Sequence, residues 1–401
     1  MLDIQKLREL NPKAIAVVSH PGIIQAILDF DYLSGKKAPS IVGIIGTGKK
    51  FERYFFGKDE VLLPLYSSFE SIPADTVAEI NLFLSNASGR RTYLTTEKAL
   101  TFFPNLLGGV IFAENVPEKF SVELYNIAEK NNRFVVGPAS VGVMLPSHLK
   151  LGAICGTQAD QLISAGVFTK GNVAVFAASG GMTNEIISLL SHYHKHISFG
   201  LSFGGDRFPI VSPKEAFLAA EADPQTEYIV YYGELGGYDE YEVAQLIREK
   251  KITKPVIAYI GGVISEMFET PPQFGHAKAM AEKGSETAQE KRKVLKEAGA
   301  FAADSYNEFV EHIKNIQYDK PMNDTDLDKK IEEINSRKSA LFISTISGEK
   351  DDEVELLGEE QTSLIQNNSF ASIVISLLLG KKIKSKEVEQ FTDLVLKMLI
   401  D

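Results

Sequence analysis

The sequence predicts an α/β fold with two doubly wound parallel sheets, followed by a short and mostly helical C-terminal extension. Short apolar runs alternate with helical patterns twice along the chain, which is typical of parallel strands joined by helical crossovers. The chain has 401 residues, 44% hydrophobic and 24% charged, so it can build two or three globular cores. From residue 317 onward this alternation gives way to a polar segment and amphipathic helical patterns.

The first alternation assigns residues 1–142 to a first domain. Ala14–Ser19 has the composition of a buried strand, and His20-Pro21-Gly22 forms a turn before a helix at Ile23–Tyr32. Ligands of such sheets bind at the carboxyl ends of the strands, so the loops that follow the strands are the candidate sites. We expect further strands at Ile41–Ile45, Val61–Leu65, Ile80–Ser85, Gly109–Ala113 and Phe134–Val136.

The second alternation assigns residues 143–316 to a second domain. Near the start of this domain, the strand and helix patterns are interrupted by Pro146, Gly152 and Gly156. We therefore place the boundary between the two domains near these residues. A long helix is predicted over Ala277–Ala298. Strands are predicted at Val173–Ala178, Ile197–Phe203, Tyr228–Tyr232, Val256–Ile260 and Phe301–Ala303.

Residues 317–401 form the extension. Gln317–Asp328 is polar and rich in turn residues, as in a linker, and Leu341–Ser347 has the pattern of a strand. Phe370–Leu379 is about half of the ~20 residues that a membrane-spanning helix needs, so we predict a buried helix there. Lys386–Ile400 is predicted to be an amphipathic helix.

Composition narrows the classes of partner. The net charge of −11 argues against nucleic acid and anionic membranes. A single cysteine, Cys155, excludes an internal disulfide and indicates a reducing compartment; without a signal peptide at the start, we expect a cytoplasmic protein. His192, His194 and His196 alternate, but they fit the end of a helix better than a metal site, so no metal is expected.

Ser179, Gly180 and Gly181 follow a predicted strand and open a predicted helix. Unpaired backbone N–H groups at a helix start bind anions, and glycines permit close approach of the ligand. The alternative is an ordinary tight turn with a serine N-cap.

His276 lies in a loop rich in glycine and proline, just before the predicted helix at Ala277–Ala298. The start of that helix would point its positive end at the imidazole. If the helix after Ser179 pointed at the same place, the two helix starts would stabilise a phosphoryl group on the ring. Glu234 ends a predicted strand among glycines and could select the imidazole tautomer. The alternatives are a structural or exposed histidine and a solvated turn carboxylate.

Asp206 follows Gly204 and Gly205 and has the same two interpretations as Glu234. The structural interpretation is favoured here, because the neighbouring Arg207 offers it a salt-bridge partner.

The first domain carries glycine together with basic residues at predicted strand ends, where they could contact the phosphates of one extended ligand. The turn at Ser19–Gly22 lacks the three-glycine fingerprint of dinucleotide binding, so NAD is not favoured. Surface loops are the alternative. The residues concerned are Gly46-Thr47-Gly48-Lys49-Lys50 after the second strand and Ser88-Gly89-Arg90-Arg91 after the fourth.

Four motifs occur in an order that resembles the succinyl-CoA synthetase alpha subunit, and more closely the alpha-like region of ATP citrate lyase and citryl-CoA synthetase. The motifs are Ser179-Gly180-Gly181, Gly204–Arg207, Gly233–Gly237 and Phe274–Ala277. The second glycine of the first motif points to the citrate branch, since the succinate branch has one glycine there. The resemblance extends over about residues 10–315. Leu28–Tyr32, Gly137–Gly142 and Gly205–Pro209 also point to the citrate branch.

This resemblance implies a Rossmann-like CoA-binding domain at residues 1–142 and a flavodoxin-like CoA-ligase domain at residues 143–316. It implies that an ATP-grasp beta-like subunit, using ATP and Mg²⁺, phosphorylates the histidine in a hetero-oligomer. Citrate would then form citryl phosphate, and CoA would convert it to citryl-CoA. His276 would be the phosphoryl carrier, Glu234 its orienting carboxylate and Glu114 a second carboxylate, with Ser179, Gly180 and Gly181 binding phosphate or citrate and Gly46, Thr47, Ser88 and Arg90 contacting CoA.

The chain departs from the family pattern at Ala178, where the family commonly has arginine. Ser339–Gly348 and the residues after it resemble the opening of the citryl-CoA lyase part of ATP citrate lyase, without its catalytic motifs. The resemblance therefore implies a chain that makes citryl-CoA and does not cleave it. The alternatives are a subunit of a split ATP citrate lyase, a succinate–CoA ligase alpha subunit, and a non-catalytic CoA-binding assembly protein.

Overall fold

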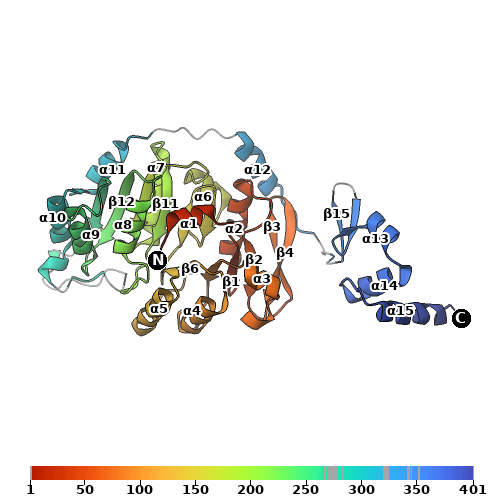
Figure 1. Cartoon of the computed structure of the whole chain (residues 1–401). Helices are drawn as coiled ribbons and strands as arrows, with labels where there is room; N and C mark the ends of the chain where they lie inside the picture. Colours follow the sequence, from red (N-terminus) through yellow and green to blue (C-terminus); the bar gives the residue numbers. More distant parts are fainter. Residues whose placement is uncertain are drawn as a thin grey trace. The chain divides into compact units, whose positions relative to one another are not determined.

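The structure is a computed structural model that divides into two compact units, Met1–Arg337 and Lys338–Asp401 (Figure 1). It describes residues 2–318 except 263, 265, 266, 269–275, 277, 278 and 282; the other described residues are 325–340, 344, 346–350 and 353–400. The first unit contains two seven-stranded sheets, one in each half.

The first sheet has the strand order β3-β4-β2-β1-β5-β6-β7. Its neighbouring strands are parallel except for β3 and β4. The strands are β1 (Ala14–Val17), β2 (Ile41–Ile45), β3 (Phe51–Phe56), β4 (Asp59–Tyr66), β5 (Leu82–Ser85), β6 (Gly108–Ile111) and β7 (Phe134–Val136).

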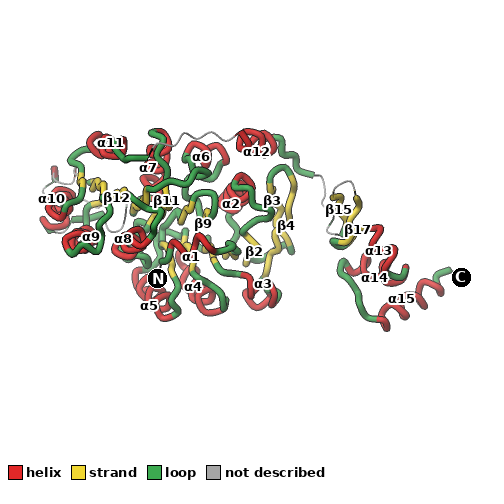
Figure 2. Tube along the Cα trace, turned by 45° about the horizontal axis from the view of Figure 1, so that its top comes forward, coloured by secondary structure: helices red, strands yellow, loops and turns green. Residues whose placement is uncertain are grey.

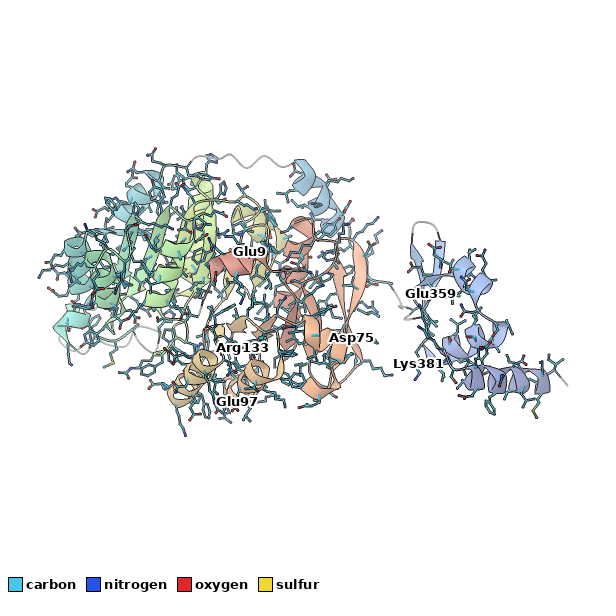
Figure 3. The ribbon with its side chains drawn as sticks, in the orientation of Figure 1. Glu9, Asp75, Glu97, Arg133, Glu359 and Lys381 are labelled. Carbon is cyan, nitrogen blue, oxygen red and sulfur yellow. The ribbon has the colours of Figure 1, made fainter. Side chains whose placement is uncertain are left out.

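Helices cover both faces of the first sheet, because successive residues of each buried strand point to opposite faces. Ala16 packs in one apolar cluster with Ile24 of α2, and Ile15 packs in another with Leu100 of α4. Arg133, which leads into β7, donates to the carbonyls of Leu100 and Phe103 at the end of α4 (Figure 3). The connecting helices are α2 (Pro21–Leu33), η1 (Phe69–Ser71), α3 (Ala74–Glu79), α4 (Gly89–Phe102) and α5 (Glu118–Lys130).

The second sheet has the strand order β14-β13-β12-β10-β11-β8-β9. Its central strands are parallel, so their carboxyl ends share one edge. The strands are β8 (Val143–Leu145), β9 (Leu149–Leu151), β10 (Val173–Ala177), β11 (Ile197–Ser202), β12 (Tyr228–Glu234), β13 (Val256–Gly261) and β14 (Phe301–Ala302).

The second sheet is also covered on both faces. Val175 packs with Ile186 of α7 on one face, and Phe176 packs with Phe217 of α8 on the other. The division between two domains at residues 142 and 143 stays a prediction. The helices are α6 (Ala159–Ser164), α7 (Gly180–His192), α8 (Pro213–Ala222), α9 (Asp239–Arg248), η3 (Gly284–Glu286), α10 (Ala288–Ala298) and α11 (Tyr306–Lys314).

The predicted α/β class is confirmed, but the prediction of wholly parallel sheets is wrong at one edge of each sheet. β3 and β4 pair antiparallel, and so do β8 with β9 and with β11. Gly57, with φ of 62°, and Ser147, with φ of 57°, lie in the tight connections. Such short connections permit only antiparallel pairing, since a parallel crossover needs a dozen or more residues.

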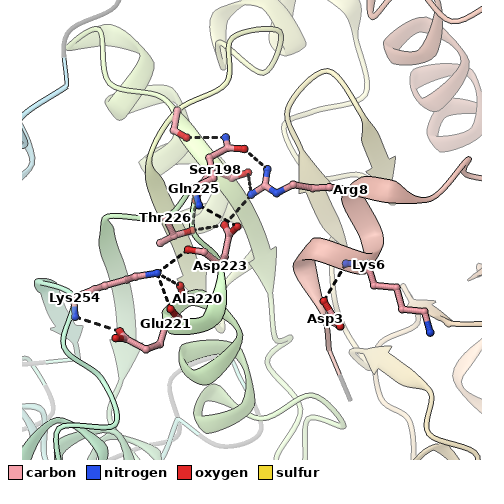
Figure 4. A network of polar contacts seen from close by, with 11 residues as sticks. Asp3, Lys6, Arg8, Ser198, Ala220, Glu221, Asp223, Gln225, Thr226 and Lys254 are labelled. Atoms are coloured by element: carbon pink, nitrogen blue, oxygen red, sulfur yellow. Dashed lines mark hydrogen bonds and ion pairs between the residues drawn. The ribbon is translucent and has the colours of Figure 1, made fainter.

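The N-terminal helix α1 (Ile4–Glu9) is attached to the amino edge of the second sheet by Arg8 (Figure 4). The Arg8 guanidinium lies 2.8 Å from the buried Asp223 carboxylate, and it donates to Gln225 at 2.6 Å and to the Ser198 carbonyl at 3.2 Å. Thr226 donates a further hydrogen bond to Asp223. The start of the chain is therefore tied to the second half of the first unit.

After the second sheet, α12 (Thr325–Asn335) lies beside α2 (Figure 2). Leu327 and Ile334 pack with Leu33, Tyr32 donates to Glu333, and Arg337 forms an ion pair with Asp29. Residues 319–324 of the predicted linker lie outside the described residues.

The described residues of the second unit form a three-stranded antiparallel sheet and three helices, which confirms a short and mostly helical extension. Most of the strand predicted at Leu341–Ser347 lies outside the described residues. The apolar run forms a helix as predicted, but the prediction that it is buried is wrong: Phe370 is 74% and Leu378 76% exposed. A unit of this size has too little interior to enclose such a helix. Its elements are β15 (Ser347–Lys350), β16 (Glu353–Leu356), β17 (Glu359–Glu360), α13 (Gln361–Asn367), α14 (Phe370–Leu379) and α15 (Lys386–Met398).

Among the described residues, none of the helices combines the length and the apolar character needed to span a lipid bilayer.

Candidate active site

The candidate site lies at the carboxyl edge of the second sheet. The loops after β10 and β11 carry Ser179 and Asp206, and Glu234 is the last residue of β12. The three strands are neighbours in the order β12-β10-β11. His276 follows β13, the next strand beyond β12. The strand order therefore places these polar residues along the carboxyl edge of the second sheet.

The central contact of the site joins His276 to Glu234. The His276 Nδ1 atom lies 2.7 Å from Glu234 Oε2, and the two side chains are 35% and 13% exposed. An ionised carboxylate accepts only, so Nδ1 must donate its hydrogen, and the lone pair of a neutral ring is then on Nε2. This geometry produces a nucleophilic nitrogen on a partly exposed imidazole. The other Glu234 oxygen, Oε1, is buried without a hydrogen-bond partner among the described residues.

The His276 ring packs against the backbone of Gly205. A Cβ atom at position 205 would lie 2.4 Å from His276 Cδ2, which is closer than real Cβ contacts allow. The glycine therefore makes room for the ring, and the loop after β11 is in direct contact with the histidine.

Asp206 lies in the site, although its sequence context favours a structural role. Burial raises the pKa of its carboxyl above the ordinary value; the charge of Glu114 adds to the rise, and His276 and backbone N–H groups of Asn115 and Val116 oppose it. Arg207 does not neutralise it as expected, since its nearest recorded partner is Glu118 at 3.9 Å. Asp206 thus interacts electrostatically with both His276 and Glu114.

Glu114 reaches the site from the first sheet. It follows β6, is exposed, and adjoins Asn115, whose φ is 58°. A Cβ atom on Gly89 would lie 2.8 Å from the Glu114 carbonyl oxygen, so the start of α4 packs closely on this loop. The structure therefore brings Glu114, Asp206 and His276 together from both halves of the first unit.

The turn at Ser179 has the predicted local structure. Ser179 is the N-cap of α7 and accepts a hydrogen bond from the Met182 N–H at 3.3 Å. Gly180 is needed for packing, because a Cβ atom there would lie 2.4 Å from Val141, whereas Gly181 has open space around it. Ala178, which replaces the arginine expected from the resemblance, is buried. Convergence of this turn on His276 stays a prediction.

The predicted helix start at His276 is wrong. Residues 279–281 are not helical, and the helix α10 begins at Ala288, with Thr287 as its N-cap. Gly284 and the threonine cap delay the helix, while Gly275 and Ala277 lie outside the described residues. The helix start expected directly after His276 is therefore not observed.

The four residues predicted to contact CoA lie at the carboxyl edge of the first sheet. Gly46 and Thr47 follow β2, while Ser88 caps α4 and Arg90 lies in its first turn. β2 and β5 flank β1 in parallel, so their ends share an edge. Thr47, Ser88 and Arg90 are exposed, and their binding role stays a prediction.

Among the described residues, no group of three or more histidine, cysteine, aspartate or glutamate side chains is placed to bind a metal ion. His192 ends α7 and His196 is buried beside β11.

Comparison with known proteins matches residues 176–301 to the CoA-ligase family. The chain is 32% identical over 395 residues to ATP-citrate synthase beta chain protein 1 of Arabidopsis thaliana, covering 94% of this chain and 64% of that protein. It is 31% identical over 398 residues to the probable ATP-citrate synthase subunit 1 of Neurospora crassa, covering 95% of this chain and 59% of that protein. The chain thus spans less than two thirds of the length of these relatives.

Two solved structures resemble the chain over 98% of its length, each with a TM-score of 0.73 and 31% identity, and the match covers 65% of each solved chain. One is ATP citrate lyase of Methanosaeta concilii in complex with (3S)-citryl-CoA, and the other is ATP citrate lyase of Methanothrix soehngenii with citrate and coenzyme A. An acetyl-coenzyme A synthetase of Ca. Korarchaeum cryptofilum, at 17% identity and a TM-score of 0.55, shares the fold alone. Residues 176–301 therefore match a CoA-ligase domain, and the chain is similar to the ATP-citrate synthases over part of their length.

Proposed function

We propose that the chain is the alpha-like subunit of a citryl-CoA synthetase, which forms citryl-CoA from citrate, CoA and ATP with release of ADP and phosphate. The observation that carries this proposal is the 2.7 Å contact between His276 Nδ1 and Glu234, which directs the imidazole lone pair to Nε2. The relatives with bound citrate, CoA or citryl-CoA support the choice of substrates.

The reaction has three transfers. Nε2 of His276 attacks the γ-phosphorus of ATP, a P–N bond forms and ADP leaves. A citrate carboxylate attacks the same phosphorus, which breaks the P–N bond and gives citryl phosphate. The CoA thiol, losing its proton, then attacks the acyl carbon and phosphate leaves. Each step needs a nucleophile held close to its target, which is the principal contribution of the protein to phosphoryl transfer.

The chain's own residues take distinct parts in this scheme. The N–H groups at the start of α7, at Ser179, Gly180 and Gly181, bind the phosphoryl group or citrate, since a helix start attracts anions. Glu234 orients the imidazole, and Glu114 supplies a second carboxylate. CoA is held at the carboxyl edge of the first sheet by Gly46, Thr47, Ser88 and Arg90.

A second chain completes the enzyme in this proposal. It is an ATP-grasp beta-like subunit that binds ATP and Mg²⁺ and associates with this chain as a cytoplasmic hetero-oligomer. The proposed division of labour assigns CoA to residues 1–142 and the phosphohistidine to residues 143–316. The greater length of the relatives is consistent with additional parts outside this chain.

The test is a product assay. The chain is incubated with its ATP-grasp partner, Mg-ATP, citrate and CoA, and the thioesters are identified by mass spectrometry. Citryl-CoA is the expected product, and it should be absent with His276→Ala. Oxaloacetate and acetyl-CoA would indicate a split lyase, succinyl-CoA formed only from succinate would indicate the succinate branch, and CoA binding without any product would indicate an assembly protein.

A further inference from the structure

A buried lysine contacts the backbone of Glu234. Lys291 of α10 is 2% exposed, and its ammonium donates to the backbone carbonyl of Glu234 at 2.9 Å and to that of Gly236. These are the last residue of β12 and a residue of the loop that follows it. One side chain therefore holds the backbone on both sides of Leu235.

The lysine is itself held by a buried carboxylate. Glu240, also 2% exposed, lies 2.6 Å from Lys291 Nζ as an ion pair without the angles of a hydrogen bond, and its Oε1 accepts from the Tyr231 hydroxyl at 2.8 Å. A Cβ atom on Gly233 would lie 2.4 Å from that same oxygen. Removing water from two charges is unfavourable unless geometry and other hydrogen bonds compensate; here Lys291 donates to two carbonyls and Glu240 Oε1 accepts from Tyr231.

We infer that Lys291, supported by Glu240 and Tyr231, is a positioning residue that fixes Glu234 against His276. Two of its contacts are with backbone carbonyls at the end of β12, those of Glu234 and Gly236, and a third is with Glu240 of α9. Its ammonium touches no reacting atom of the proposed chemistry. The inference rests on the proposed function of Glu234 as the group that orients the imidazole. A displacement of about 1 Å at such a contact is enough to reduce a rate by about 100-fold.

A second lysine of the same chemistry provides a matched control. Lys254 donates to the carbonyls of Ala220, Glu221 and Asp223 at 2.7, 2.8 and 2.7 Å, at the amino edge of the same sheet (Figure 4). Losing it removes comparable hydrogen bonds far from β12's carboxyl end. It therefore separates a local positioning effect from a general loss of stability.

The experiment measures the His276 tautomer by ¹⁵N NMR of the whole chain, without nucleotide or partner, at a pH above the titration of the ring. The variants are Lys291→Met/Glu240→Gln, which leaves no unpaired buried charge, Lys254→Met and Glu234→Gln. We expect the proton on Nδ1 in the wild type and in Lys254→Met, and a mixture of tautomers in the double variant and in Glu234→Gln. If the double variant does not fold, Lys291→Gln/Glu240→Gln, which keeps an N–H donor at position 291 without a buried charge, takes its place.

A wild-type tautomer in the Lys291 variant would overturn the inference, whether or not Glu234→Gln changes it. A mixture in Lys254→Met equal to that in the double variant would overturn it as well. Failure of the proposed function is a different result, because it would appear as absence of phosphohistidine with the tautomers unchanged.

Discussion

The position of one proton on the His276 ring determines which ring nitrogen can act as the nucleophile. Glu234 lies 2.7 Å from Nδ1 of His276, so its charge favours the tautomer that leaves Nε2 nucleophilic. The other carboxylates, Asp206 and Glu114, add negative charge without occupying Nδ1.

Glu234→Gln should slow phosphorylation of His276 by at least about 10-fold, because the amide can donate as well as accept and so no longer selects the tautomer, nor does it stabilise the developing positive charge. The measurement is the rate of phosphohistidine formation with partner and Mg-ATP. Glu118→Gln, an exposed change nearby, should leave the rate unchanged. Equal rates for wild type and Glu234→Gln would remove Glu234 from the mechanism.

Asp206→Asn should raise stability at neutral pH. Burial, the largest cause, raises the pKa of Asp206 in the folded state, so folding favours its protonated form. The wild type therefore loses stability as pH rises from the ordinary aspartate pKa through the raised one, and the amide does not. Urea unfolding at a series of pH values should show a gain at pH 7 that vanishes in acid. A gain that instead grows as the pH falls would contradict this assignment.

The sequence predicts these residues unevenly. Glu234 and His276 stand out as a carboxylate and a histidine among glycines, and the structure pairs them. For Asp206 the sequence favours a structural salt bridge with its chain neighbour Arg207, yet in the structure Arg207 lies beside Glu118. Lys291 and Glu240 carry no sequence signal, since a lysine and a glutamate on amphipathic helices are usually solvated.

At the scale of elements, the apolar runs of the sequence predict the parallel strands at the centre of both sheets. They do not predict the antiparallel pairing at one edge of each sheet. β3 is an aromatic strand whose pairing direction depends on the tight turn at Gly57. The sequence predicts a helix from Ala277, whereas α10 begins at Ala288, because helical periodicity does not locate a cap. Thr287 determines where α10 begins.

Arg8→Ala should destabilise the first unit by about 2 kcal/mol, because it leaves the buried Asp223 carboxylate without its cationic partner. The estimate is below that of a fully buried pair because Arg8 is 22% exposed. Lys6→Ala on the same helix, an exposed position, should stay within about 0.5 kcal/mol of the wild type. Urea denaturation compares the two, and equal midpoints would show that α1 is not held through Arg8.

At the scale of the whole molecule, the chain has two compact units, and the candidate site lies in the first. The four buried apolar clusters of the described residues draw all their members from residues before Lys338. The sequence predicts a separate C-terminal extension, but it could not predict that α14 keeps an exposed apolar face. Burial depends on the neighbours that surround a helix, and the composition of the helix does not show which neighbours it has.

A chain ending at Arg337 should therefore keep the unfolding midpoint of the first unit to within about 2 °C, since it retains every member of those clusters and the ion pair between Arg337 and Asp29. Calorimetry of both chains makes the comparison. A chain ending at Asn315, which also lacks α12, is the contrasting variant and should unfold at a lower temperature. Loss of folding in the longer truncated chain would show that the second unit supports the first.

The most direct test of the account is to locate the phosphoryl group. The chain is incubated with its ATP-grasp partner and labelled Mg-ATP, digested at alkaline pH, and analysed by mass spectrometry. The account predicts one phosphohistidine, at position 276, which is discharged on addition of citrate and is absent from His276→Ala. Label on another residue, or label that survives His276→Ala, would contradict it.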